Sequence, residues 1–176
     1  MIEPKFKIEN RLQGNGFLAK SSRGKLIDLK AEPYLPKSEE WIVEEHLGYW
    51  SLDSIRFKAS EIILFPGPND RIANGYDLRT ELSRGNKLIL NGNVLDWLLA
   101  NQEYIPEEWK GKYIHFLGTV YRRLGCNFSE AYKREDALHV RSLYWGGSKF
   151  CDGDSWLGRK FNASNPVALI SKKVGI

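Results

Sequence analysis

Residues 113–121 read Tyr-Ile-His-Phe-Leu-Gly-Thr-Val-Tyr, and residues 138–145 read Leu-His-Val-Arg-Ser-Leu-Tyr-Trp. Both stretches show a period of two, which is typical of β-strands. In the first, one face is expected to hold Ile114, Phe116, Gly118 and Val120, and the other Tyr113, His115, Leu117, Thr119 and Tyr121. In the second, Leu138, Val140, Ser142 and Tyr144 alternate with His139, Arg141, Leu143 and Trp145. We therefore predict an antiparallel meander, with residues 124–137 inserted in its first hairpin.

The segment that follows is expected to continue the meander through short strands. Gly146-Gly147-Ser148 signals a tight turn, residues 149–150 a strand, residues 151–154 another turn, and residues 156–161 a further strand. Residues 166–171 form an apolar run that can close the set.

The chain before residue 113 alternates between helix and strand signals. Asn93 is expected to cap a helix in which Leu95, Leu98 and Leu99 share one face. Pro106, followed by two acids, is expected to start a short wedge that packs through Ile105 and Trp109. Two other helices are predicted, at residues 38–46, after Ser38, and at 75–82. Strands are predicted at residues 5–9, 17–20, 25–29, 61–65 and 87–90. Of these, 17–20 and 25–29 are expected to be the two arms of a hairpin.

These patterns predict a single α+β domain over residues 1–176, with short helices packed on an antiparallel sheet. Residues 1–54 would supply a hairpin and a helix, residues 55–112 a strand and short helices, and residues 113–176 the β-meander. The longest apolar runs are far shorter than the roughly 20 residues of a membrane-spanning helix. The first residues, Met1-Ile2-Glu3-Pro4-Lys5, lack an apolar secretory segment, so we expect a cytoplasmic protein with no membrane partner.

Charge is unevenly distributed along the chain. The 26 basic and 22 acidic residues give +4 overall, whereas residues 113–176 alone hold 10 basic and 5 acidic residues. Cations beside aromatic rings suit a single-stranded nucleic acid or another anionic polymer. The binding residues predicted on this basis are Tyr113, Tyr121, Arg122, Arg141, Trp145 and Arg159. A solvated basic face, with one set of rings in the core, is the alternative explanation.

A catalytic pair would have to come from two thiols and three imidazoles. Cys151 follows the predicted strands that carry His115 and His139, so a nucleophile and a base could lie near one another there. No known nucleophile motif surrounds Cys151 or Cys126, and the spacing does not decide whether these two are bridged.

Acidic residues show no pattern that a metal or cofactor requires. Asp152 and Asp154 could accept a hard cation from a turn, but a calcium loop needs more oxygen ligands at fixed spacing. Glu45 and His46 would point about 100° apart on a helix. We therefore expect no metal site and no cofactor.

Four segments together resemble a group of uncharacterised bacterial proteins. They read NVLDWLL at residues 93–99, IPEEWKGK at 105–112, FLGTVYR at 116–122 and VRSLYW at 140–145. The chain departs from that pattern through the insertion at 124–137 and through Leu117, where an aromatic residue is usual. The resemblance implies no activity.

The sequence thus favours a non-catalytic binding or accessory domain that contacts a protein or an anionic polymer through its sheet face. The alternative is a small hydrolase or transferase that uses Cys151 with His115 or His139. Oligomeric state, substrate and process are not predicted.

Overall fold

The protein is an α+β domain in which helices cover both faces of one large sheet. The structure is a computed structural model that describes residues 26–36, 41–47, 54–56, 61–66, 73–85, 87–123 and 138–171. The predicted strands at 5–9 and 17–20, the insertion at 124–137 and Cys126 lie outside these residues. No helix in the described ranges is long and apolar enough to cross a membrane.

The main sheet is built around the predicted meander. Its path is β4 (Ile62–Phe65), β11 (Val167–Ser171), β7 (Tyr113–Arg123), β8 (Leu138–Trp145) and β9 (Phe150–Trp156). Two strands join off this path: β2 (Trp41–His46) pairs with β7, and β6 (Lys87–Ile89) pairs with β11. All pairs are antiparallel except β11 with β7, where Val167 is opposite His115. The predicted meander is confirmed, and the sheet is mixed because β11 returns parallel to β7.

Two small strand pairs flank this sheet. They are β1 (Leu26–Asp28) with β3 (Ser54–Arg56), and β5 (Ala73–Asn74) with β10 (Lys160–Phe161). The strand predicted at 25–29 is therefore present, and its partner in the described chain is β3.

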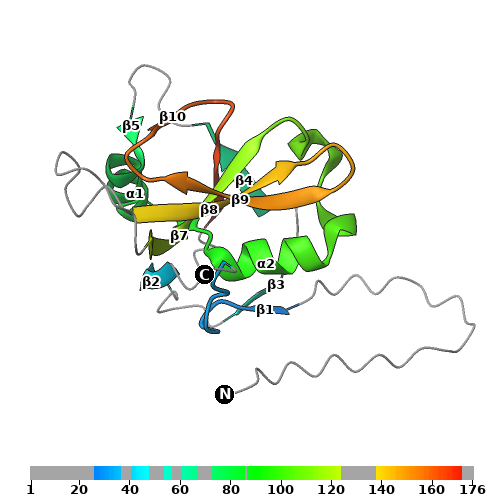
Figure 1. The fold of residues 1–176 in the computed structure, drawn as a ribbon, viewed down its shortest axis with the longest axis horizontal. Helices are drawn as coiled ribbons and strands as arrows, with labels where there is room; N and C mark the ends of the chain where they lie inside the picture. The colour runs from blue at the N-terminus through cyan, green and yellow to red at the C-terminus, as the bar shows by residue number, and fades with distance from the viewer. Residues whose placement is uncertain are drawn as a thin grey trace, which may run out of the picture.

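The two α-helices lie on opposite faces of the sheet. Helix α2 (Gly92–Ala100) buries Val94, Leu95 and Leu98 in the same cluster as Phe116 of β7. Helix α1 (Gly75–Ser83) belongs to the second cluster on the other face, with Leu117, Val140 and Leu169 among its strand residues. In Figure 1, α2 lies between the sheet and the β1–β3 pair. The chain after β1 therefore passes close to α2.

The helix starts differ from the predicted ones in detail. Asn74 caps α1 by accepting a hydrogen bond from the backbone of Asp77 at 2.9 Å. Helix α2 begins at Gly92, so Asn93 is not its cap; the Asn93 amide instead donates to backbone carbonyls at Asp28 and Ala31. The segment after Pro106 forms only a short 3-10 turn, η3 (Glu107–Trp109), after a similar turn, η2 (Gln102–Tyr104). Ile105 and Trp109 are buried, as the wedge prediction requires.

The helix predicted at residues 38–46 is wrong, because residues 41–46 form strand β2. Trp41, Ile42 and Val43 are aromatic and β-branched residues that favour strands. The free edge of β7 supplies the hydrogen-bond ladder, with Trp41 opposite Arg123. Trp41 is buried by this docking. Long-range pairing has thus overridden the local helix-start signal.

The predicted alternation of β7 fails beyond Phe116. From Phe116 to Tyr121, β7 advances five residues while its partner β8 moves only two, from Arg141 to His139. The two strands thus differ by three residues over this stretch. Because neighbouring strand residues point to opposite sides, an odd difference moves the β7 residues after the irregularity to the face opposite the predicted one. Tyr121 and Thr119 consequently share the α2 face with Phe116. Tyr113, His115 and Leu117 remain on the other face.

A close chain crossing accompanies this irregularity. The amide of Gly118 donates to the carbonyl of Leu90 at 3.0 Å. A Cβ atom at Gly118 would lie 2.8 Å from both the Asn91 Cα and the Leu90 oxygen. Only glycine allows the backbone before α2 to approach β7 this closely.

Candidate functional site

Arg141 is the central residue of the candidate site. It lies on β8, is only 2% exposed, and points toward α2. Its Nη1 donates to Asp96 of α2 at 2.7 Å, and its Nη2 donates to Asp152 of β9 at 3.2 Å. Its guanidinium also lies 5.1 Å from the ring centre of Tyr34. The prediction placed Arg141 among binding residues of an open sheet face, but the structure buries it between two carboxylates.

The pair formed by Arg141 and Asp96 is shaped by burial. Burial raises the pKa of Asp96, and the attraction of Arg141 offsets this rise only in part. Burial alone would lower the pKa of Arg141, but the adjacent Asp96 and Tyr121 hold that pKa above its ordinary value. The Nε hydrogen of Arg141 has no acceptor among the described residues. Arg141 therefore keeps one buried donor unused.

A series of aromatic and polar contacts extends this centre toward β2. The Tyr121 hydroxyl donates to the carbonyl oxygen of Tyr34 at 3.2 Å. Trp41 meets Tyr121 and His139 edge to face, with centroid distances of 6.4 and 5.1 Å. His139 Nδ1 lies 2.8 Å from Asp154 Oδ2, and this hydrogen bond lowers the pKa of Asp154. His139, one of the two imidazoles predicted as a base for Cys151, is thus hydrogen-bonded to a carboxylate.

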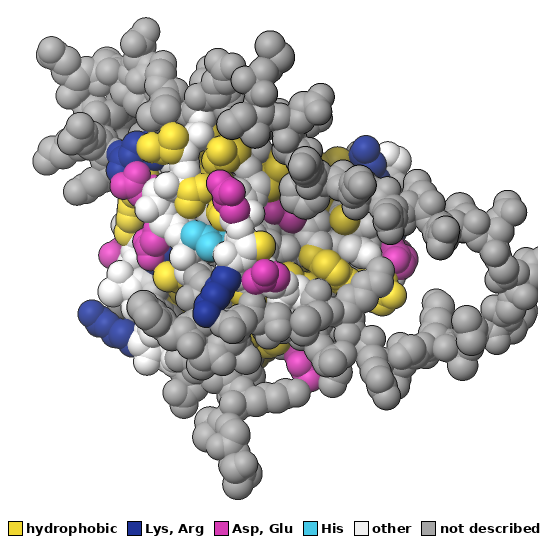
Figure 2. Space-filling model, turned by 90° about the horizontal axis from the view of Figure 1, so that it is seen from below, with side chains coloured by type: hydrophobic (Ala, Val, Ile, Leu, Met, Phe, Trp, Pro, Cys, Tyr) yellow, Lys and Arg dark blue, Asp and Glu magenta, His cyan; other side chains and the backbone are white. Residues whose placement is uncertain are grey.

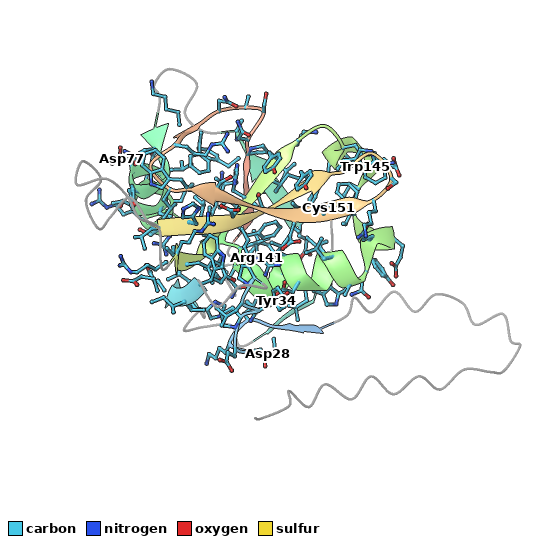
Figure 3. The ribbon with its side chains drawn as sticks, in the orientation of Figure 1. Asp28, Tyr34, Asp77, Arg141, Trp145 and Cys151 are labelled. Atoms are coloured by element: carbon cyan, nitrogen blue, oxygen red, sulfur yellow. The ribbon has the colours of Figure 1, made fainter. Side chains whose placement is uncertain are left out.

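A pocket of about 1130 Å³ opens beside Arg141, between α2 and the chain after β1. In Figure 3, Arg141 and Tyr34 lie next to one another below the sheet, and Asp28 lies further out. Apolar and polar side chains both line the pocket: Ile27, Asp28, Ala31, Glu32, Pro33, Tyr34, Leu35, Asn93, Asp96, Trp97, Leu99, Arg141 and Asp152. Four of these carry carboxyl groups and one carries a guanidinium. The pocket is therefore acidic in a chain that is basic overall.

Exposed aromatic and aliphatic side chains lie in this pocket and next to its wall. Tyr34 and Leu35 are each 44% exposed, and Tyr104 is 45% exposed. Tyr104 contacts Trp97 of the pocket wall, with ring centres 5.4 Å apart. The underside of the molecule, seen in Figure 2, carries hydrophobic, acidic and basic side chains and a histidine close together. Such a mixture suits a ligand with both apolar and charged parts.

The remaining predicted binding residues do not gather in one place. Arg122 is held by Glu44 of β2 through two hydrogen bonds, of 2.8 and 2.6 Å. Trp145 packs edge to face on Phe150, and the Lys110 ammonium lies 4.1 Å from a Trp145 ring centre. These two arrangements occur at different ends of β7 and β8.

Tyr113 and Arg159 lie on the opposite face from Arg141. Tyr113 stacks on Tyr144 with centroids 4.8 Å apart and planes 4° from parallel. Arg159 Nη1 donates to Ser155 Oγ at 3.2 Å. Of the six predicted binding residues, only Tyr121 and Arg141 meet at the candidate site.

The thiol and the imidazoles are likewise separated. Residues 151–154, predicted as a turn, belong to strand β9, so Cys151 faces away from Asp152 and Asp154. Cys151 thus lies on the opposite face from His139, whose ring contacts Asp154. Its sulfur donates a weak hydrogen bond to the carbonyl of Lys149 at 3.7 Å, and within the described chain Cys151 is a free thiol. The structure does not bring Cys151 and His139 together.

His115 shares a face with Cys151 but is fully buried. Its ring meets Phe161 edge to face at 4.7 Å. Neither ring nitrogen has a hydrogen-bond partner in the part of the chain that is described. Burial, helped by the charge of Arg159, lowers the pKa of His115 to about 3. A base that is buried in this way has no access to a substrate.

Sequence reasoning missed three residues of the site: Asp96, Tyr34 and Trp97. Asp96 had a usable signal, because it is the only charged residue in the apolar run at 94–99. A carboxylate on the buried side of a helix needs a partner, and Arg141 supplies one. Tyr34 carried no such signal, since its segment has no periodicity.

Comparisons with known proteins add no evidence on function. No protein-family model matches the chain, and no curated protein or solved structure does either. The resemblance to the bacterial group stays a prediction.

Proposed function

We propose that the protein is a non-catalytic binding domain whose pocket beside Arg141 accepts an organic cation. The ligand group would be an ammonium or guanidinium on an apolar chain, such as the basic side chain of a partner protein. One observation carries this proposal: a pocket with aromatic walls holds more carboxylates than its own cation can neutralise. Within the earlier hypothesis, this favours a protein partner over an anionic polymer.

The charge balance of the pocket supports a cationic ligand. Arg141 and Asp96 form the more deeply buried ion pair, with side chains 3% and 31% exposed. The Asp152 side chain is 45% exposed and makes one ion-pair contact, of 3.2 Å, with the same guanidinium. Asp28 and Glu32 are exposed at the pocket rim. After the buried pair cancels, three carboxylates therefore remain to attract a cation.

The aromatic side chains suit the apolar part of such a ligand. Tyr34 and Trp97 line the pocket from two different segments. Flat rings attract cations through their faces and bury methylene groups, which favours alkylammonium and guanidinium ligands.

Binding of an anionic polymer has less support. Arg122 and Arg141, two of its predicted contacts, are engaged by Glu44, Asp96 and Asp152. A phosphate would have to displace these carboxylates. The hydrolase or transferase alternative also has less support, because Cys151 and His139 are on opposite faces.

The test uses agmatine, a small molecule with a guanidinium and an ammonium on an apolar chain. Isothermal titration at low salt is expected to show saturable binding, weakened about tenfold by Asp152→Asn, because one charge contact is lost. Glu108→Gln, which removes an exposed carboxylate outside the pocket, is the matched control and is expected to bind normally.

Two anionic probes complete this test. Hexanoate has a similar apolar chain with the opposite charge, and a thymidine oligonucleotide represents the polymer. We expect neither to bind. Oligonucleotide binding that weakens with salt, without agmatine binding, would refute the proposal and restore the polymer hypothesis.

A further inference from the structure

Strand β9 forms a free edge of the sheet next to the pocket. It is the last strand in the sheet order, and within the described ranges it pairs only with β8. Its residue Asp152 lines the pocket. The backbone at this edge and the acidic pocket therefore meet at one residue.

The hydrogen-bond pattern shows which backbone groups are available on β9. The amide of Gly146 donates to the carbonyl of Lys149, and the amide of Leu157 donates to that of Leu138. In an antiparallel pair, bonded and non-bonded residues alternate, so these two bonds fix the pattern between them. Asp152 and Asp154 consequently direct their N–H and C=O groups away from β8. No other residue in the described ranges supplies a partner to these four backbone groups, and the Asp154 amide interacts only with its own carboxylate.

The two ends of the same edge are already occupied. The Gln102 side chain donates to the carbonyl of Phe150 and accepts from its amide, both at 2.9 Å. The side-chain amide of Gln102 thus makes the same two hydrogen bonds with Phe150 that a residue on a neighbouring strand would make. At the other end, the carbonyl of Trp156 accepts from Arg159. Within the described ranges, the central part of the edge, at Asp152 and Asp154, has no neighbouring strand.

We infer that a partner protein adds an extended basic segment to β9 as a further antiparallel or parallel strand. This inference rests on the proposed function, because a basic side chain of the added strand would enter the pocket at Asp152. The partner's backbone would pair with the outward-facing N–H and C=O groups of Asp152 and Asp154, and the Asp154 amide would exchange its own carboxylate for this partner. Edge strands of sheets bind peptides in this way, with backbone bonds for affinity and side-chain contacts for specificity.

Charge identifies the kind of partner. The carboxylates of Asp152 and Asp154 are 45% and 49% exposed and lie on the α2 face, where the pocket is. Opposite charges across neighbouring strands are stabilising, and like charges are destabilising. A second copy of the chain, pairing through the same edge, would place these aspartates against each other. A lysine- or arginine-containing segment is therefore the expected occupant.

The test uses a short peptide that alternates lysine and threonine and is blocked at both ends. Amide hydrogen exchange is expected to slow at least about tenfold at Asp152 and Asp154 when the peptide is bound, because their N–H groups gain partners. Agmatine, which has no strand to add, is expected to leave both rates unchanged. A matched peptide of glutamate and threonine is expected not to bind.

Two N-methylated peptides separate backbone pairing from simple charge attraction. One is methylated at its lysines and the other at its threonines, so each loses the donors along one edge. Only one of those edges can face β9, so one peptide is expected to bind about tenfold more weakly than the other. Equal affinities with unprotected amides would overturn strand addition. If agmatine still binds in that case, the cation pocket stands, whereas failure of agmatine refutes the pocket itself.

Discussion

His115 is expected to make the protein sensitive to acid. Its pKa is about 3 in the folded protein because its ring is buried, against an ordinary value of 6.5. Below about pH 6.5, His115 therefore takes up a proton in the unfolded chain but stays neutral in the folded protein. The free energy of unfolding then rises with pH over this window and falls as the solution is acidified.

The size of this effect follows from the two pKa values. A difference of one pKa unit is worth about 1.4 kcal/mol, so the full window corresponds to about 5 kcal/mol. At about pH 4.5, where the folded ring is still neutral, the loss relative to about pH 7 is about 2.5 kcal/mol. Such a loss is a large part of the stability of an ordinary domain.

The perturbation is His115→Leu, which removes the titrating group and keeps an apolar side chain of moderate size. Because neither ring nitrogen has a partner among the described residues, we expect a change below about 1 kcal/mol at neutral pH. Urea unfolding followed by tryptophan fluorescence at both pH values compares the variant with the parent. The variant is expected to lose about 2.5 kcal/mol less on acidification.

Direct titration of the imidazole by NMR provides the control. The His115 ring is expected to stay neutral down to about pH 4 in the folded protein. If parent and variant lose the same stability on acidification, or if this ring titrates near its ordinary value, the reasoning from burial is wrong.

Three further substitutions test the packing around the site by urea unfolding. Arg141→Leu leaves Asp96 and Asp152 without their cation. It is expected to lower the free energy of unfolding by about 3 kcal/mol at neutral pH, and by less in acid, where the buried carboxyl is protonated. An unchanged free energy of unfolding would contradict the buried ion pair. Gly118→Ala is expected to cost about 2 kcal/mol, because its Cβ would lie 2.8 Å from backbone atoms, whereas Gly85→Ala, with its nearest atom at 3.5 Å, should be nearly neutral. Gln102→Ala is expected to cost about 1 kcal/mol and to speed amide exchange at Phe150, since it removes two hydrogen bonds; unaltered exchange there would show that the edge is capped by another group.

The α+β fold with its meander could be predicted because its strands and helices have strong local patterns. The alternation in β8 identifies the strand, and the apolar spacing of Leu95 and Leu98 identifies α2. These periodicities come from burial on one side, so they survive in any compact arrangement of the chain. The same reasoning located β4 and β6 within one residue at each end.

The errors occur where distant chain segments decide the conformation. Trp41 becomes part of a strand because β7 has a free edge, which no local pattern reveals. The irregularity before Tyr121 depends on the close crossing of the chain at Gly118. Gly153 reads as a turn residue, but in β9 it makes room for the Tyr113 hydroxyl, which would lie 2.8 Å from a Cβ atom there.

The centre of the site follows from two sequence irregularities considered together. In β8, alternation places Arg141 on the same face as Leu143, which is an apolar and buried position. In α2, Asp96 interrupts an apolar run on the helix that covers this face. A buried charge is tolerated only with a partner of opposite sign, so each residue implies the other. The excess carboxylates beside this pair, Asp152 above all, are not needed for its neutralisation, and this surplus is the observation from which we propose a ligand site beside the structural ion pair.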